Sequence, residues 1–237
     1  EEVSQGQGEP LTMTYDYSFR GRIRSYRDVL GQTQTYDYDP LGRLIKTALG
    51  NTRSIFEYNS LGLMASITTE EGPLGDLGNP HVKIKLEYDK QGREVKRIFD
   101  LNGVEQTLVQ VYDEVDNLSS RTLKEGDITI RDETYIYDVR SRLVSYECTG
   151  TQPPVDPHGR LISAQFFTFD ALDNITLVDT IYTDGTYLMA EYAFDNIDPV
   201  QLSSLTYTFG GEAPRTTLFT YDEEGNMTRD ELGRVLE

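Results

Sequence analysis

Apolar and polar residues alternate in several short stretches of the chain. Val82–Tyr88 alternates apolar and charged side chains, Thr14–Phe19 does so with aromatic residues on one side, and Asp127–Arg131 is a shorter example. A two-residue period is typical of a β-strand with one buried face. No apolar stripe at helical spacing lasts beyond about two turns. The pattern predicts an all-β fold with about sixteen to eighteen strands of roughly eight to twelve residues and essentially no helix.

A short phrase separates the alternating stretches and recurs along the chain. Its clearest copy is Tyr38–Leu44: an aromatic residue, an acid, two variable positions, a turn residue, an arginine and an apolar residue. Further copies begin at Tyr88, Tyr112, Tyr137, Phe169 and Tyr221, and a broken copy begins at Tyr58. Units repeating at intervals of this kind indicate a stacked or coiled array.

The phrase has the chemistry of a β-hairpin turn. In Asp39-Pro40-Leu41-Gly42, the acid accepts backbone hydrogen bonds, the proline presets φ, and the glycine supplies the position that needs φ > 0. We therefore expect the aromatic residue to end one strand and the apolar residue after the turn to begin the next. In copies where asparagine follows the turn residue, we expect that asparagine to adopt φ > 0.

The predicted site is structural and consists of the residues at these corners. They are Tyr38, Asp39, Gly42, Arg43, Tyr88, Asp89, Gly92, Arg93, Tyr112, Asp113, Asn117, Tyr137, Asp138, Arg142, Phe169, Asp170, Asn174, Tyr221, Asp222 and Gly225.

The predicted organisation is continuous. Residues 1–10 form a polar or disordered lead-in, and residues 11–237 form one array of hairpins with long loops near 70–80 and 149–159, where Gly and Pro gather. Asp230–Leu236 supplies another corner without the strand that should follow it. The chain is therefore expected to be a fragment of a longer array, with exposed strand edges that could pair with a second copy.

Composition narrows the choice of partners. The 40 acidic and 22 basic residues give a net charge of −18, which disfavours nucleic acid and an anionic membrane surface. The excess either keeps a large surface soluble or attracts a basic partner, and the sequence leaves both open. No stretch is long enough for a membrane-spanning helix, so no membrane insertion is expected.

Candidate reactive residues are few. A single cysteine, Cys148, leaves no disulfide within the chain, and His81 and His158 lack a second ligand at metal-binding spacing. No cofactor, metal or catalytic site is predicted. The sequons at Asn117, Asn174 and Asn226 occupy the same place in the repeat, so the repeat itself accounts for them.

The Tyr-Asp-x-x-Gly-Arg-Leu phrase at this spacing resembles the YD repeat of the RHS (rearrangement hot spot) proteins, which include shell components of bacterial insecticidal toxin complexes, polymorphic toxins and animal teneurins. The resemblance runs from about Tyr15 to Leu236. It implies a curved, spiralling strip of antiparallel hairpins that forms part of a hollow shell. It further implies a secreted bacterial toxin, in which the partners are the rest of the shell and the enclosed toxin polypeptide, and in which this segment has no catalysis of its own.

Two readings remain beside that one. Shells of the toxin type carry an aspartyl autoprotease with paired Asp-Pro-x-Gly motifs. This chain has such motifs at Asp39 and Asp156, but they lie far apart in sequence, and turn chemistry explains both acids.

The alternative function is an extracellular module that binds carbohydrate or protein. Exposed Tyr182, Tyr187 and Tyr192 could then stack on sugar rings, although tyrosines in a repeat sheet also pack between strands.

Overall fold

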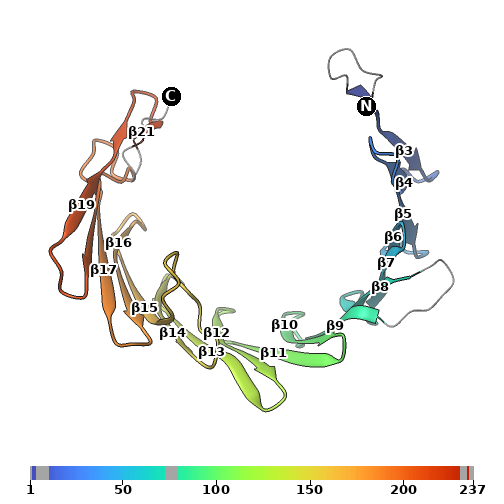
Figure 1. Ribbon diagram of the computed structural model, residues 1–237, viewed down its shortest axis with the longest axis horizontal. Helices are drawn as coiled ribbons and strands as arrows, with labels where there is room; N and C mark the ends of the chain where they lie inside the picture. The colour runs from blue at the N-terminus through green and yellow to red at the C-terminus, as the bar shows by residue number, and fades with distance from the viewer. Residues whose placement is uncertain (1, 4–10, 73–79, 230–233, 235–237) are drawn as a thin grey trace. The chain divides into compact units, whose positions relative to one another are not determined.

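The computed structural model describes residues 2–3, 11–72, 80–229 and 234. The part of the chain so described contains strands and turns but no helix, and hence no helix that could cross a membrane. The chain divides into two compact units, unit 1 (Glu1–Val109) and unit 2 (Gln110–Glu237), and the division falls within one strand. Figure 1 shows the strands following one another in chain order within each unit.

Unit 1 is a strip of antiparallel strands. Its strands are β1 (Glu2–Val3), β2 (Leu11–Thr12), β3 (Thr14–Tyr17), β4 (Ile23–Arg27), β5 (Thr33–Tyr38), β6 (Leu44–Leu49), β7 (Thr52–Tyr58), β8 (Met64–Glu71), β9 (Pro80–Tyr88), β10 (Glu94–Leu101) and the greater part of β11 (Val104–Tyr112). Glu70 and Glu71 thus belong to β8, and residues 73–79 of the expected loop lie outside the described residues.

Unit 2 continues with the same construction. Its strands are β12 (Leu118–Glu125), β13 (Ile128–Tyr137), β14 (Leu143–Thr149), β15 (Ile162–Phe169), β16 (Ile175–Tyr182), β17 (Tyr187–Ala193), β18 (Ser204–Phe209), β19 (Arg215–Leu218), β20 (Thr220–Tyr221) and β21 (Met227–Arg229). The seventeen strands β3 to β19 agree with the predicted number.

Pairing follows chain order. In unit 1, β5 pairs with β6 through registers such as Tyr36↔Thr47, and in unit 2, β15 pairs with β16 through registers such as Gln165↔Thr180. The prediction of an all-β fold made of antiparallel hairpins is confirmed.

A sheet of one layer buries little. Among the described residues no large side chain is less than 2% exposed, and the buried hydrophobic residues of unit 2 form two small clusters, one around Tyr146 and Tyr182 and the other around Ala190 and Leu205. The strands still have unlike faces. Along β13, buried Ile130 and Glu133 lie on one face while exposed Asp132 and Ile136 lie on the other.

Candidate functional site at the hairpin corners

Each corner is a five-residue hairpin connection that begins at the acid of the phrase. At the Asp39 corner, Gly42 N donates to Asp39 O at 2.8 Å and Asp39 N donates to Arg43 O at 2.9 Å. Gly42 has a φ of 86°. This is a type I turn followed by a left-handed residue and a bulge, and the strand register shifts at the same point. Strand β5 therefore ends at Tyr38 and β6 begins at Leu44.

The acid of the phrase holds the turn together with both carboxylate oxygens. Asp39 Oδ1 accepts from Arg43 N at 2.8 Å, and Asp39 Oδ2 accepts from Arg43 Nε at 2.7 Å. The same pair of bonds recurs at Asp89 and Asp138. At Asp138 the side-chain hydrogen bond from Arg142 lowers the pKa of the carboxyl below its ordinary value of 3.8. The carboxylate form is thus the one that the corner stabilises.

Asparagine replaces the arginine at three corners and makes the same bond. The side-chain amides of Asn117, Asn174 and Asn226 donate to Oδ2 of the acid four residues earlier, at 3.1, 2.8 and 3.0 Å. The expectation of φ > 0 at these asparagines is wrong. The positive φ lies one residue earlier, for example 69° at Asp116. Only the fourth turn position needs the left-handed region, and the next residue returns to the strand so that its side chain can reach back to the acid.

Successive corners touch each other through the arginine of one and the aromatic ring of the next. In unit 1 the Arg43 guanidinium lies 4.4 Å from the Tyr58 ring centre, and Tyr58 Oη donates to Leu44 O at 2.8 Å. In unit 2, Arg142 lies 4.7 Å from the Phe169 ring. Both contacts provide cation–π attraction, and at Tyr58 the ring hydroxyl adds a hydrogen bond to the backbone. We call this succession of contacts the corner ladder.

The predicted corner residues all occupy strand junctions. Each copy of the phrase joins two consecutive strands. The copy that begins at Tyr38 joins β5 to β6, that at Tyr88 joins β9 to β10, that at Tyr112 joins β11 to β12, that at Tyr137 joins β13 to β14, that at Phe169 joins β15 to β16, and that at Tyr221 joins β20 to β21. Each corner holds its own hairpin. Some corner residues also reach beyond it, as Arg142 does by donating to Asp173 and Asn174 does by donating to Pro199 O.

Two further corners escaped sequence reasoning because the aromatic residue or the acid is replaced, and the broken copy at Tyr58 that the sequence indicated has the same form. Ser18 accepts from Arg22 N at 3.0 Å between β3 and β4, and Asp28 accepts from Gln32 N at 2.8 Å between β4 and β5. The broken copy holds its turn with Asn59, which accepts from Leu63 N at 3.0 Å. A search for Asp, Asn or Ser followed three residues later by Gly would have found all three.

The segment 149–159, expected to be a loop, contains another corner. Val155 pairs with Leu161 in an isolated bridge, and Asp156 Oδ2 accepts from Arg160 Nε at 2.7 Å and from Tyr182 Oη at 3.0 Å. Burial acts to raise the pKa of the Asp156 carboxyl, but hydrogen bonds from Arg160, Tyr182 and His158 lower it well below its usual range. As at Asp39, the partners of Asp156 are those of a turn acid.

Cys148 and its surroundings form a closed polar cluster rather than a reactive one. Glu133 is 3% exposed, and its carboxylate accepts from Arg121 Nε at 2.6 Å and from Tyr146 Oη at 2.9 Å. Cys148 is likewise 3% exposed, and burial raises the pKa of its thiol. Among the described residues no three His, Cys, Asp or Glu side chains are grouped to hold a metal ion.

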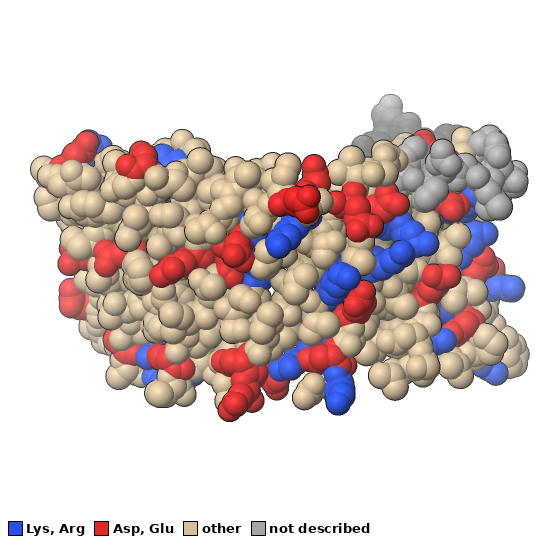
Figure 2. All heavy atoms as spheres, turned by 90° about the horizontal axis from the view of Figure 1, so that it is seen from below, with Lys and Arg blue, Asp and Glu red and all other residues tan. Residues whose placement is uncertain are grey.

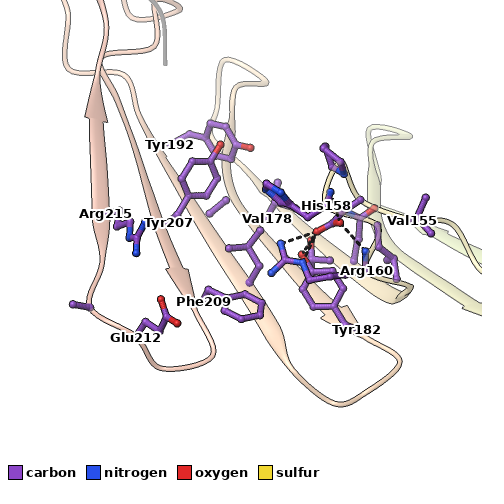
Figure 3. A pocket seen from close by; sticks show the side chains of 18 residues that line it. Val155, His158, Arg160, Val178, Tyr182, Tyr192, Tyr207, Phe209, Glu212 and Arg215 are labelled. Carbon is purple, nitrogen blue, oxygen red and sulfur yellow. Dashed lines mark hydrogen bonds and ion pairs between the residues drawn. The ribbon is translucent and has the colours of Figure 1, made fainter. Parts of the chain in front are cut away.

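A hollow of about 800 Å³ lies on one face of unit 2, which we call the pocket face. Figure 3 shows the rings of Tyr192 and Tyr207 at one side, Phe209 and Tyr182 below, and Arg160 beside Tyr182. The Arg160 guanidinium lies 4.4 Å from the Tyr182 ring centre and 4.3 Å from that of Phe209. The hollow is therefore bordered by rings from several strands.

The three tyrosines expected to be exposed, Tyr182, Tyr187 and Tyr192, do not form one exposed surface. Tyr182 is 2% exposed because the Asp156 corner and Arg160 cover it, so the expectation that it is exposed is wrong. Tyr187 is 46% exposed. It alternates with Leu188, which lines the hollow, so Tyr187 belongs to the opposite face. Tyr192 alone of the three is a partly exposed lining residue of the hollow.

Charge is distributed unevenly between the units. Unit 1 has 13 basic and 16 acidic residues, and unit 2 has 9 basic and 24 acidic ones. In Figure 2, acidic side chains predominate over the strands of unit 2, whereas basic side chains accompany them over unit 1. On the face of unit 2 opposite the pocket, Glu147 and Glu191 are exposed and make no ion pair with any described residue.

The strands, corners and corner ladder define a β-hairpin repeat protein. The RHS Repeat family model matches residues 17–53, a stretch that contains the Ser18, Asp28 and Asp39 corners. The match covers that stretch only, and the recurring phrase and its hairpins extend the same pattern along the rest of the described chain. No curated protein sequence matches it.

Two solved structures share the fold. A crystal structure of TcdB2-TccC3 without its hypervariable C-terminal region superposes with a TM-score of 0.69 at 14% identity, over 89% of this chain and 12% of that one. A Photorhabdus luminescens Tc holotoxin pore with a substituted TccC3 superposes with a TM-score of 0.57 at 14% identity, over 91% of this chain and 13% of that one. The chain thus spans only about an eighth of the length of either.

Proposed function

We propose that this chain forms a stretch of wall in a secreted RHS shell that encloses a toxin polypeptide for delivery, without catalysis of its own. Its partners are the remainder of that shell and the enclosed polypeptide. The observation that carries the proposal is the repeated corner, in which the acid and the arginine bond each other and, at several corners, the arginine also stacks on the next ring.

The polar groups of the site support a wall more than an active centre. A catalytic carboxylate needs a poised pKa and room for a reactant. The corner acids instead accept several hydrogen bonds each, which lower their pKa, as at Asp138 and Asp156. The fold shared with the TcdB2-TccC3 structure supports the same role.

Limited proteolysis of the natural polypeptide that carries this chain tests the proposal. Protease is added to the intact polypeptide and, as the matched control, to the non-RHS segments of the same polypeptide expressed alone. We expect at least one such segment to stay uncut within the intact polypeptide while the same segment alone is digested. Equal rates of cleavage in the two samples would refute enclosure.

A further inference from the structure

The hollow on the pocket face of unit 2 has the size and lining of a binding site. Its volume of about 800 Å³ lies within the range of ligand pockets. Val178, Leu188 and Ala190 line it from β16 and β17, and Tyr192, Tyr207 and Phe209 add rings from β17 and β18. A hairpin strip needs no such concavity for its own pairing, since each strand is already satisfied by its neighbours.

Several of the polar groups around the hollow are already paired with one another. Asp156 accepts from Arg160, His158 and Tyr182, and Gln165 Nε2 donates to Thr180 Oγ1 at 3.2 Å. The Arg160 guanidinium is paired with Asp156 at 2.6 Å and lies against two rings. Apart from His158, Glu212 and Arg215, the lining therefore offers mainly apolar and aromatic surface.

This chemistry selects among occupants. A sugar held against Val178, Leu188 and Phe209 would place hydroxyl groups against carbon atoms, which costs free energy on burial. An acidic segment would be repelled by unit 2, with its 24 acidic against 9 basic residues. A cation would lose its hydration beside Arg160. The charged lining residues balance, since Asp156 and Glu212 are matched in number by Arg160 and Arg215. An uncharged segment with aliphatic or aromatic side chains meets none of these penalties.

We propose that this pocket binds an uncharged, apolar segment of a polypeptide. Naming that polypeptide as the enclosed one rests on the proposed function, and the pocket face would then be the inner face of the wall. Tyr207 is 38% exposed and, with Tyr192, forms the aromatic side of the pocket, against which such a segment would stack.

The absence of tryptophan from the chain allows a direct test. The probe is the capped peptide acetyl-Gly-Trp-Leu-Gly-amide, whose tryptophan emission is followed as the full 237-residue chain is added. We expect the emission to shift to the blue and to saturate, because the indole leaves water. Acetyl-Asp-Trp-Asp-Gly-amide should shift little, and maltohexaose should not displace the apolar peptide.

Tyr207→Ser should weaken binding of the apolar peptide roughly tenfold. The matched control is Tyr187→Ser, which removes a similarly exposed tyrosine from the opposite face and should leave binding unchanged. Tyr192→Ser is a second pocket variant in case Tyr207→Ser does not fold, as judged by circular dichroism. Equal effects of the pocket and control variants would overturn the assignment.

The remaining outcomes separate this inference from the proposed function. No emission shift with the wild-type chain, or displacement of the peptide by maltohexaose, overturns the pocket assignment even if proteolysis shows an enclosed segment. Peptide binding that depends on Tyr207 supports the pocket even if no segment of the natural polypeptide is protected, in which case enclosure alone fails.

Discussion

At the scale of single residues, each corner depends on one position in the left-handed region and one side-chain oxygen, usually that of an acid, that accepts from the backbone. Glycine fills that position at Gly42, and Asp116, Ser141 and Asp173 fill it elsewhere with φ between 58° and 70°. Short polar side chains tolerate this region better than other non-glycine residues do. The residue type at this position can therefore vary while the backbone conformation stays the same, which is why copies of the phrase without glycine still form corners.

Gly150 is the glycine at which an added methyl group should matter most. Its φ is 118°, and a Cβ there would lie 2.5 Å from Ile130 O, a backbone atom that β13 fixes. Gly185 also has a positive φ, of 82°, but its Cβ would meet nothing within 4 Å. We expect Gly185→Ala to cost about 1 kcal/mol and Gly150→Ala about 2–3 kcal/mol or more in the free energy of unfolding in urea. Equal losses would contradict the predicted clash.

At the scale of the element, a hairpin is held by its own turn and tied to the next hairpin by the corner ladder. Arginine holds the turn and also stacks on the next ring, whereas asparagine at 117, 174 and 226 bonds the acid and is too short to stack. The chain therefore already contains the substitution that separates the two contributions.

Arg43→Asn should keep the turn and lose the stacking on Tyr58. The amide can replace the Nε bond to Asp39, but it is too short to reach the ring 4.4 Å from the guanidinium. We expect the loss of the cation–π contact to cost about 0.5–1 kcal/mol in unfolding free energy. Arg43→Ala, which removes both contacts, should cost more. If the two variants unfold at the same urea concentration, the side-chain bond to Asp39 contributes nothing.

The corner acids give the fold a dependence on low pH. Hydrogen bonds from the residue four positions later lower the pKa of Asp138, Asp170 and Asp222 from 3.8. A group whose pKa is lower in the folded than in the unfolded chain stabilises the fold above the unfolded value, and that stability is lost as the pH falls through the folded value. The melting temperature should thus fall below a pH of about 4.

Asp138→Asn should flatten part of that fall, because its side chain can no longer take up a proton. Melting followed by circular dichroism between pH 2 and 6 measures the slope. Glu191→Gln is the control, since Glu191 is an exposed acid of β17 that accepts no hydrogen bond from a described residue. A slope below pH 4 that Asp138→Asn leaves as steep as the control does would exclude the corner acids as its cause.

The phrase predicted the elements well because turn chemistry is local. The strand that ends at Tyr38 and the one that begins at Leu44 follow from five residues. The burial of Tyr182 could not be predicted in this way, because it depends on the Asp156 corner, 26 residues earlier, folding onto its hydroxyl. The pocket could not be predicted for the same reason. Its lining side chains come from separate hairpins, and the face of the sheet on which each side chain lies depends on the strand register.

At the scale of the whole molecule, each unit is a sheet in which the contacts run between strands that follow one another in sequence. Such an array is stabilised hairpin by hairpin and has only small buried clusters. A wall suits this construction, because a single layer leaves both faces available while the corners keep the strands in register. Unit 2 uses one face for the pocket and carries exposed acids on the other.

Electron cryo-microscopy of the natural polypeptide that carries this chain tests the central claim most directly. The account predicts that the hairpins lie in the wall of a hollow body, with Tyr192 and Tyr207 facing the enclosed volume and density for another segment of polypeptide within it. A map in which the pocket face is packed against a second folded layer, or faces bulk solvent, would contradict the account.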